Sequence, residues 1–244
     1  MIQGGNDLLP RAFARQLSEK IHYGTQVVRI EQHARGVQVV FLRAGSPQKI
    51  TADYVICAIP FAVLKQVEIA PQFSPGKQKA IDELAYTSVA GVLMQSGRKV
   101  WVDQGLSGEA YTDLPVMLVA EATSNQPGRR GILFSNMTGP QARRVTSMTE
   151  RERITFTLKT TEQLFPGLSQ HFEGGVSKCW DEDEWARGGY AWFKPGQMFS
   201  LMPHIARPEG RVHFAGEHTS SWPGYMQGAL ESGARAAREI ERAP

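Results

Sequence analysis

The chain has 244 residues and a formal charge of +3, from 27 Lys and Arg residues against 24 Asp and Glu residues. A chain of this length can bury a large core, in one large domain or two modest ones. Its basic residues are scattered along the sequence, which argues against a nucleic-acid-binding protein, because such proteins carry a basic stripe or patch.

Two further features limit the class of protein. The longest apolar run, residues 54–64, is too short to span a bilayer and contains Pro60, so we expect no membrane contact. Cys57 and Cys179 are too few for a disulfide scaffold, and we expect both to be packed core thiols. They weakly favour a reducing compartment such as the cytoplasm and leave the location open.

Hydrophobic periodicity predicts a helix first and then a run of strands. Leu9, Phe13 and Leu17 recur every four residues, which is typical of an amphipathic helix. The segments that follow are rich in Val, Ile and Phe, and polar turns separate them. In chain order, we expect a helix at residues 8–20, a β-hairpin at 26–33 and 36–43, and strands at 49–52 and 53–60.

The middle of the chain predicts a second group of strands and helices. Thr149, with Glu152 three residues later, has the pattern of a capping box at the start of a helix. Pro166 and Gly167 then stop this helix. In chain order, we expect a helical turn at residues 61–65, a helix at 75–84, strands at 88–96, 116–122 and 131–135, a helix at 149–165, and a strand at 176–180.

The apolar run at residues 53–60 is continuous rather than alternating. This pattern indicates a strand that is buried on both faces of an α/β layer. A sheet domain in the middle of the chain is therefore flanked by segments that return to another layer. We place the two boundaries near residues 71–75 and 172–180.

The final segment contains the most informative phrase, RVHFAGEHTSSWPGYMQGALESGA, which begins at Arg211. It predicts a buried strand at residues 212–215, a tight loop at 216–222 and a helix that begins at Pro223. Proline suits a first helical position because its missing N–H would have no partner there. A strand and loop that lead onto a helix start point free amides at an anionic or electron-rich ligand.

Small residues recur along this terminal helix, so one face carries almost no side chain. Some other group must press closely against that face. The residues are Gly224, Gly228, Ser232 and Ala236, with Ala229, Gly233 and Ala237 beside them.

Four phrases, in order along the chain, resemble the flavin-dependent amine oxidases, a family that includes monoamine, polyamine and L-amino-acid oxidases. They are GGNDLLP at residues 4–10, QVVRI at 26–30 with the AIP that ends at Pro60, the stretch at 180–197, and the terminal strand, loop and helix. The resemblance implies an α/β, or α+β mixed, fold. It combines part of an FAD-binding domain, residues 1–72 and 179–244, with a mixed-sheet substrate domain, residues 73–178.

The family also has a feature that this sequence lacks. Its flavin domain begins with a βαβ unit carrying G-x-G-x-x-G, which holds the pyrophosphate. None of the 24 glycines here are spaced as G-x-G. We therefore expect the chain to correspond to the C-terminal half of such an oxidase, as a truncation, a fragmentary gene or one chain of a cleaved enzyme, and to be inactive alone.

The resemblance implies noncovalent FAD bound near the terminal loop. Glu217 would accept a hydrogen bond from a ribityl or ribose hydroxyl, or alternatively would cap the following helix. Gly216 would allow close backbone approach. The backbone of Val28 would meet the adenine, although the strand pattern alone makes Val28 a core residue. The helix-start segment assigned to the flavin ring is Gly224, Tyr225, Met226, Gln227 and Gly228.

Tyr190 stands where family members with covalent flavin have a cysteine, which is the reason to expect noncovalent binding. Tyr225 would be an aromatic wall that orients the substrate amine. The second wall falls at Ala191, so Trp180 or Trp192 would have to replace it, unless both are core aromatics.

In many family members a lysine holds a water beside the flavin ring. Lys65 and Gln66 straddle that position, and an ungapped register puts Gln66 on it. Lys65 has the alternative of being an ordinary solvated lysine.

The resemblance implies an FAD-dependent oxidoreductase that oxidises a primary amine or an L-amino acid by hydride transfer, giving an imine and hydrogen peroxide. Two alternatives stay open. One is a non-catalytic partner subunit or scaffold derived from such an oxidase. The other is one chain of a two-chain oxidase, in which a separate chain supplies the nucleotide-binding half.

The substrate is not fixed by the sequence. Amino-acid oxidases need a cation for the substrate carboxylate, and in this family that arginine tends to lie in the half that is absent here. No motif positions Arg98 or Arg187 for this role. The six histidines show no metal-ligand spacing, so we expect no metal site.

Overall fold

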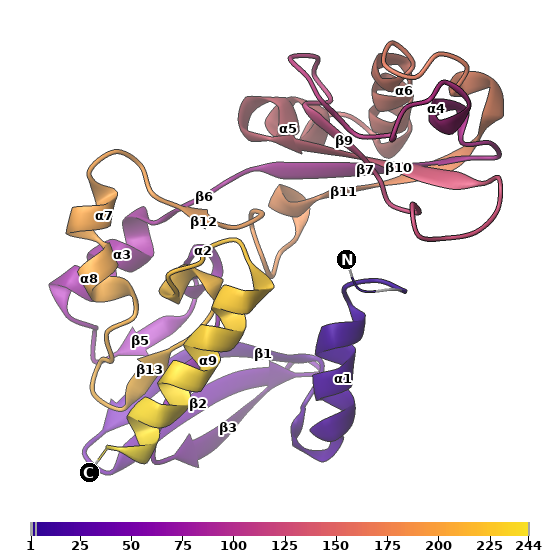
Figure 1. The fold of residues 1–244 in the computed structure, drawn as a ribbon. Coiled ribbons are helices and arrows are strands. Elements are labelled where there is room, and N and C mark those ends of the chain that lie inside the picture. Colours follow the sequence, from indigo (N-terminus) through magenta and orange to yellow (C-terminus); the bar gives the residue numbers. More distant parts are fainter. Residues whose placement is uncertain (1, 3, 244) are drawn as a thin grey trace.

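The computed structural model describes residue 2 and residues 4–243; residues 1, 3 and 244, which belong to the predicted first and last segments, lie outside the described residues. Two lobes are joined by a pair of extended segments (Figure 1). The first lobe holds the beginning and the end of the described range 4–243, and the second lobe holds residues 89–179.

The first lobe contains a four-stranded sheet with the order β3-β2-β1-β5. The predicted hairpin is confirmed, with His33 paired to Gly36 at its tip. Its third strand is longer than predicted and begins at Ser46. The sheet is mixed, because β5 runs parallel to β1 while the other pairs are antiparallel. The elements are α1 (Leu8–Gln16), η1 (Ser18–Lys20), β1 (Thr25–His33), β2 (Gly36–Arg43), β3 (Ser46–Ala52) and β5 (Glu68–Ala70).

A second, two-stranded sheet of the first lobe joins distant parts of the sequence. β4 (Val55–Cys57) runs parallel to β13 (Val212–Phe214). The prediction of a strand over residues 53–60 that is buried on both faces is wrong, because the strand has three residues and the Ile56 side chain is 40% exposed. Within the described chain β13 is the one strand that pairs with β4. The other edge of β4 is therefore open.

The second lobe is a five-stranded sheet covered by helices. Every strand pair in it is antiparallel, which differs from the mixed sheet expected for this domain. Short connections suffice between antiparallel strands, and none of these strand pairs needs a parallel crossover. Its strands, in the order β11-β7-β10-β9-β8, are β7 (Val89–Ser96), β8 (Ala110–Tyr111), β9 (Leu118–Glu121), β10 (Gly131–Thr138) and β11 (Phe172–Cys179).

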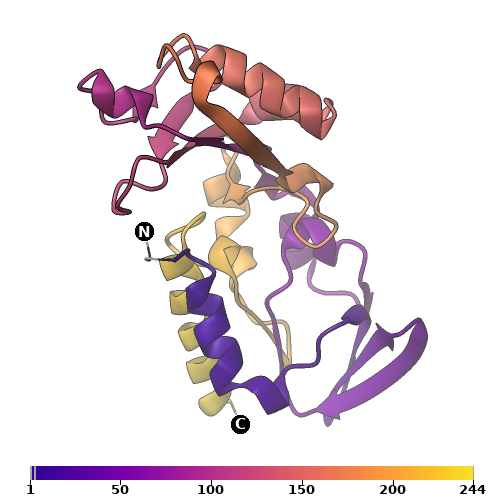
Figure 2. The ribbon, with the colours of Figure 1, turned by 90° about the vertical axis from the view of Figure 1, so that its right-hand side faces the viewer.

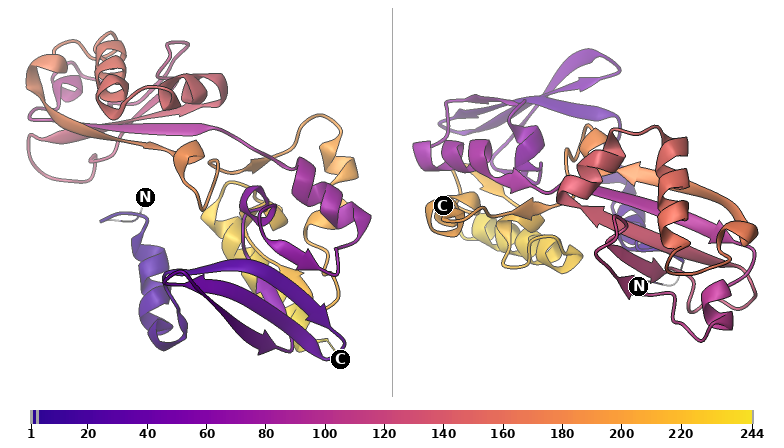
Figure 3. Two further views of the ribbon diagram at one scale, coloured as in Figure 1. Left: turned by 180° about the vertical axis from the view of Figure 1, so that it is seen from behind. Right: turned by 90° about the horizontal axis from the view of Figure 1, so that it is seen from above.

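Helices cover one face of this sheet. α5 (Gly139–Thr146) and α6 (Glu150–Thr161) lie on the side away from the first lobe (Figure 2). Residues along β10 alternate between buried and half-buried, as expected when the two faces differ. The predicted capping box of α6 is confirmed, since the Thr149 side chain accepts from the Glu152 amide and the Glu152 carboxylate accepts from the Thr149 amide. The sheet thus turns its other face toward the first lobe (Figure 3).

Each lobe has its own hydrophobic core, and the change between them comes later than the predicted border near residue 72. Phe73, Ile81 and Leu84 belong to the core of the first lobe, and the second core begins at Ala90. The segment that crosses between the lobes includes β6 (Ala85–Tyr86), which pairs with β12 (Ala191–Trp192) on the way back. The crossing therefore consists of two hydrogen-bonded strands.

The remaining elements are short, apart from α3 and the last helix. No helix within residues 4–243 has both the length and the apolar character needed to cross a membrane. These elements are α2 (Phe61–Leu64), α3 (Pro75–Glu83), α4 (Val100–Asp103), η2 (Ser169–His171), η3 (Trp180–Glu182), α7 (Gln197–Ser200), α8 (Met202–Ile205), η4 (Glu217–Thr219) and α9 (Met226–Glu241).

A lysine lies in the core of the first lobe. The side chain of Lys77, on α3, is fully buried, and its Nζ donates to the carbonyl of Ile205 at 2.6 Å. The same Nζ lies 3.5 Å from the ring centre of Phe214. Burial lowers the pKa of Lys77 to about 7, although the Glu209 carboxylate opposes this shift. The two cysteines are also buried and unpaired, as expected.

Replacing Lys77 with methionine tests how this buried amine affects stability. Between pH 7 and pH 10.5 the unfolded chain binds the lysine proton and the native chain does not, so the free energy of unfolding should rise with pH. The Lys77→Met variant should lose this rise and be the more stable protein below pH 7. Urea titrations across this pH range would measure both effects, and equal slopes in the two proteins would contradict the expectation.

Candidate functional site

The strand, loop and helix at the end of the chain form the core of the candidate site, but the helix begins later than predicted. α9 starts at Met226, and Pro223 lies in the preceding turn. Gly224 has φ +81°, in the left-handed region, and Tyr225 is extended. These two residues redirect the chain before the helix can start, so the prediction of Pro223 as the first helical residue is wrong.

Glu217 ties the loop to the returning crossover strand. One carboxylate oxygen accepts from the Gly224 amide at 2.6 Å, and the other accepts from the Ala191 amide at 3.1 Å. Burial raises the pKa of Glu217, and these two hydrogen bonds oppose that shift. Glu217 does not cap α9, because the residue at the N-cap position is Tyr225. The carboxylate therefore fixes the relative positions of β12 and the start of α9.

The small residues of α9 allow this helix to pack closely against the loop that precedes it. Gly228, Ser232 and Ala236 are its buried residues. A Cβ added at Gly228 would overlap the Ser220 hydroxyl and the carbonyl of Trp222. Gly233 belongs to the neighbouring row of small residues on α9, and its surroundings differ. A Cβ added there would have no neighbour within 4 Å. The expected group that presses on the bare face is thus the chain itself, at residues 220–222.

An arginine that the sequence analysis did not single out holds the other side of α9 against β13 and the loop after it. Arg235 donates to the carbonyl of Phe214 at 2.7 Å and to the Thr219 hydroxyl at 3.0 Å. It also pairs with Glu239 at 2.7 Å, and Glu239 contacts His213 Nδ1 at 2.9 Å. Its position, four residues before an acidic residue on the same helix, was the available sequence signal.

The start of α9 is open to a ligand. Tyr225 makes no side-chain hydrogen bond to the first helical turn, so the free amides of that turn are uncapped. Exposed apolar groups surround them, because Trp222, Tyr225 and Met226 are 58%, 65% and 47% exposed. The rings of Trp222 and Tyr225 meet edge to face at 6.4 Å. Free amides beside exposed aromatic rings fit a planar group that carries negative charge on one edge.

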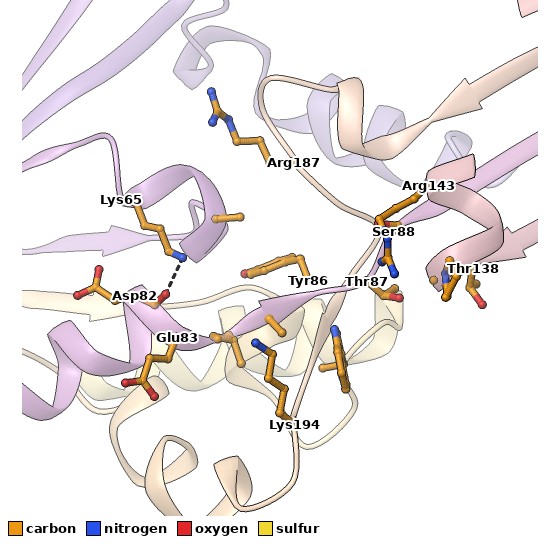
Figure 4. A pocket seen from close by; sticks show the side chains of 16 residues that line it. Lys65, Asp82, Glu83, Tyr86, Thr87, Ser88, Thr138, Arg143, Arg187 and Lys194 are labelled. Atoms are coloured by element: carbon orange, nitrogen blue, oxygen red, sulfur yellow. Dashed lines mark hydrogen bonds between the residues drawn. The ribbon is translucent and has the colours of Figure 1, made fainter. Parts of the chain in front are cut away.

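The other predicted residues divide between two cavities. Lys65 and Trp192 line a cavity of about 690 Å³ between the lobes (Figure 4). Val28 and Gln66 line a second cavity of about 390 Å³ beside β1. Arg187 lines both, and it donates to the Gln66 side chain at 3.2 Å.

The structure thus does not bring the five predicted catalytic side chains into one pocket. Tyr225 lies at the start of α9, and Trp180 lies outside both cavities with its ring 5.0 Å from Lys178 Nζ. Lys65 is exposed and donates to the Asp82 carbonyl at 2.7 Å. Their roles at a flavin stay predictions.

The histidine beside Glu217 packs in the core of the first lobe. His218 is buried, and its ring packs 4.7 Å from that of Phe61. Burial lowers its pKa to about 4, so the ring is neutral near pH 7. Among the described residues, no group of three or more His, Cys, Asp and Glu side chains could hold a metal ion.

Comparison with known proteins identifies the family. The family described as flavin containing amine oxidoreductase matches residues 1–241. The chain belongs to this amine oxidase family. A Bacillus subtilis (strain 168) protein named "Putative L-amino-acid oxidase YobN" is 36% identical over 251 residues, which cover 100% of this chain and 52% of that protein. An L-amino-acid oxidase of Demansia vestigiata is 29% identical, over 99% of this chain and 48% of its own length.

Solved structures share the fold of this amine oxidase chain. Cyclohexylamine oxidase from Brevibacterium oxydans IH-35A has a TM-score of 0.87 and 23% identity, over 98% of this chain and 53% of its own. Putrescine oxidase bound to putrescine has a TM-score of 0.86 and 23% identity over the same shares of the two chains. The chain spans about half the length of the curated relatives it matches. The family implies a flavin cofactor.

Two glycine-to-alanine changes in α9 test whether this helix packs against residues 220–222. Gly228→Ala should cost about 1–3 kcal/mol of stability, because the added methyl forces the 220–222 loop away. Gly233→Ala, the matched control in the same helix, should add about 0.5–1 kcal/mol, since alanine favours a helix and has room there. Thermal unfolding would measure both changes. Equal effects at the two positions would show that the loop does not press on α9.

Proposed function

We propose that this chain forms the flavin-ring and substrate parts of an FAD-dependent oxidoreductase that oxidises a primary amine or an L-amino acid to an imine, with hydrogen peroxide as the second product. The observation that carries the proposal is the uncapped start of α9 beside exposed Trp222 and Tyr225, in a chain of the amine oxidase family. Bound FAD would supply the hydride acceptor.

The residues of the terminal loop would hold the isoalloxazine edge. The backbone amides of Met226 and Gln227 would donate to the edge of the ring that becomes negative on reduction, because a helix start favours negative charge. Glu217 keeps this helix start in place through its bonds to Gly224 and Ala191. Each Glu217 oxygen has a second lone pair, so the carboxylate can also accept from a ribityl hydroxyl.

Two further contacts would position the rest of the cofactor and the substrate. Val28 lines the cavity beside β1 together with Pro60, where its backbone would meet the adenine. The exposed ring of Tyr225 would orient the substrate nitrogen through its electron-rich face without protonating it. Hydride loss needs that nitrogen lone pair, which an ammonium group lacks.

We expect FAD to be held without a covalent bond. The residue after the Gly188-Gly189 pair is Tyr190, which offers no thiol to the ring. Tyr190 instead packs against Gly224, where an added Cβ would lie 3.3 Å from the tyrosine ring. Tyr190 would therefore contribute a packing surface to the flavin site.

A second candidate function is that of one chain in a two-chain oxidase. The exposed side chain of Ile56 favours it, because parallel sheets are normally covered on both faces. The open edge of β4 favours it too, because an unpaired edge offers free N–H and C=O groups to another strand. A separate polypeptide that resembles the other half of the relatives would supply the missing strands and the pyrophosphate site. The alternative to this candidate is a non-catalytic scaffold, which would use the same open edge of β4 to bind a partner.

Co-expression with the unmatched half of the Bacillus subtilis relative tests these functions. We expect a yellow complex that produces hydrogen peroxide from amino acids or amines, and free FAD in the supernatant after acid precipitation. The chain alone, incubated with FAD and then separated from unbound FAD by gel filtration, should be colourless. A stable complex without flavin would favour the scaffold, and flavin that stays with the precipitated protein would refute noncovalent binding.

Tyr225 variants separate orientation of the substrate from folding. In the active complex Tyr225→Ala should lower kcat/KM by about tenfold, because the ring face is lost, whereas Tyr225→Phe keeps a ring and should change it little. Steady-state peroxide assays would measure both variants, with flavin absorbance as the check on occupancy. An alanine variant as active as the unaltered complex would remove Tyr225 from the site.

A further inference from the structure

The helical side of the second lobe has a cavity of its own, apart from the candidate flavin site. It is lined by residues of the connection after α5 and by one face of α6. These two helices lie on the side of the lobe that faces away from the first lobe (Figure 2). The cavity has a volume of about 570 Å³, which is large enough for an amino-acid side chain or a small ligand.

The basic side chains at this cavity have no acidic partners. Arg151 and Lys159 line it and are exposed, and within residues 4–243 neither side chain makes a hydrogen bond or an ion pair. A third cation lies next to the cavity, since the guanidinium carbon of Arg144 is 5.2 Å from the ring centre of Phe156. All three charges are therefore available to an anionic partner.

The acidic side chains of the same region are already engaged by backbone amides. Glu150 accepts from the Ser177 amide at 3.1 Å, and Glu152 accepts from the Thr149 amide at 2.8 Å. Glu162, just after α6, accepts from two amides of the turn that follows it. These bonds hold the carboxylates in place, whereas the cations stay free, so the cavity attracts negative charge.

Apolar groups lie deeper in the cavity than the charged ones. Met148 and Phe156 are half-buried, and the Phe156 ring packs against the core of the second lobe. Arg151 and Lys159 are exposed at the same cavity. The site thus offers an apolar recess with cations beside it, which suits a partner that combines negative charge with an apolar side chain.

The spacing of the cations suits an extended peptide. Arg151, Thr155 and Lys159 follow one another every fourth residue, so they lie along one face of α6. The first and last are separated by about 12 Å along the helix axis. An extended chain advances about 13 Å over four residues, and its first, third and fifth side chains share one face. Acidic side chains at the first and fifth positions would therefore reach both cations.

We propose that this cavity binds an extended acidic segment of a partner protein. One acidic side chain of the segment pairs with Arg151, and a second, four residues along, pairs with Lys159. An apolar side chain midway between them enters the recess at Met148 and Phe156. The recess favours a peptide over a flat lipid surface, because a single protruding side chain fills it. This site is independent of the proposed oxidase function.

The probe is a fluorescein-labelled peptide of sequence SESFSES, whose glutamates flank a phenylalanine at alternate positions. The isomer SEESFSS places the same two charges side by side, and SKSFSKS reverses them. Fluorescence anisotropy with the full chain should show that SESFSES binds more tightly than both controls. Binding should weaken as salt is added, because the ion pairs are exposed. A peptide with serine in place of phenylalanine should also bind more weakly.

Variants of the chain test the two cations. Arg151→Gln and Lys159→Gln should each weaken SESFSES binding by about fivefold, as loss of one exposed ion pair implies. Arg143→Gln is the matched control, because it removes the same charge from α5 at a residue that lines the other cavity. The double variant Arg151→Glu, Lys159→Glu should prefer SKSFSKS to SESFSES. Circular dichroism would verify that each variant is folded.

Four results would overturn the proposal. They are equal affinity for SESFSES and SEESFSS, equal losses in Arg151→Gln and Arg143→Gln, no change of peptide preference in the folded double variant, and no binding of SESFSES at low salt. If the chain instead sedimented with vesicles of phosphatidylcholine and phosphatidylserine, lost this with Arg151→Gln and ignored the peptides, the face would bind a membrane and the peptide site would be refuted. None of these measurements uses flavin or turnover, so failure here is distinct from failure of the oxidase proposal.

Discussion

The close contact between Gly228 and residues 220–222 determines where the rest of the candidate site lies. The loop can approach the α9 backbone only because no side chain intervenes. Ser232 then accepts from the Gly216 amide at 2.9 Å, and Glu217 reaches both Ala191 and Gly224. One backbone contact thus fixes a half-buried carboxylate, an uncapped helix start and the crossover strand relative to one another.

The two lobes share the candidate site through the paired strands β6 and β12. Thr87 and Tyr190 continue this pairing, since the Thr87 amide donates to the Tyr190 carbonyl at 2.9 Å. The Tyr86 hydroxyl accepts from the Phe61 amide at 2.9 Å, so the crossing is also anchored in the core of the first lobe. Groups from both lobes therefore line one cavity beside this crossing.

Local patterns predicted the elements that depend on neighbours in the sequence. The β1–β2 hairpin and the Thr149 cap are set by residues only a few positions apart. The start of α9 was missed because the left-handed conformation of Gly224 is decided by its packing against Tyr190. Buried Lys77 was missed for the same kind of reason, since its acceptor lies 128 residues away.

The cavity between the lobes illustrates the limit of motif-based reasoning about the substrate. Its basic residues are far apart in sequence, so no spacing could have predicted that Arg143 and Lys194 share a cavity. Asp82 and Glu83 line the same cavity, so its surface carries charges of both signs. This charge pattern, like the cavity itself, is set by the packing of the two lobes and not by any local motif.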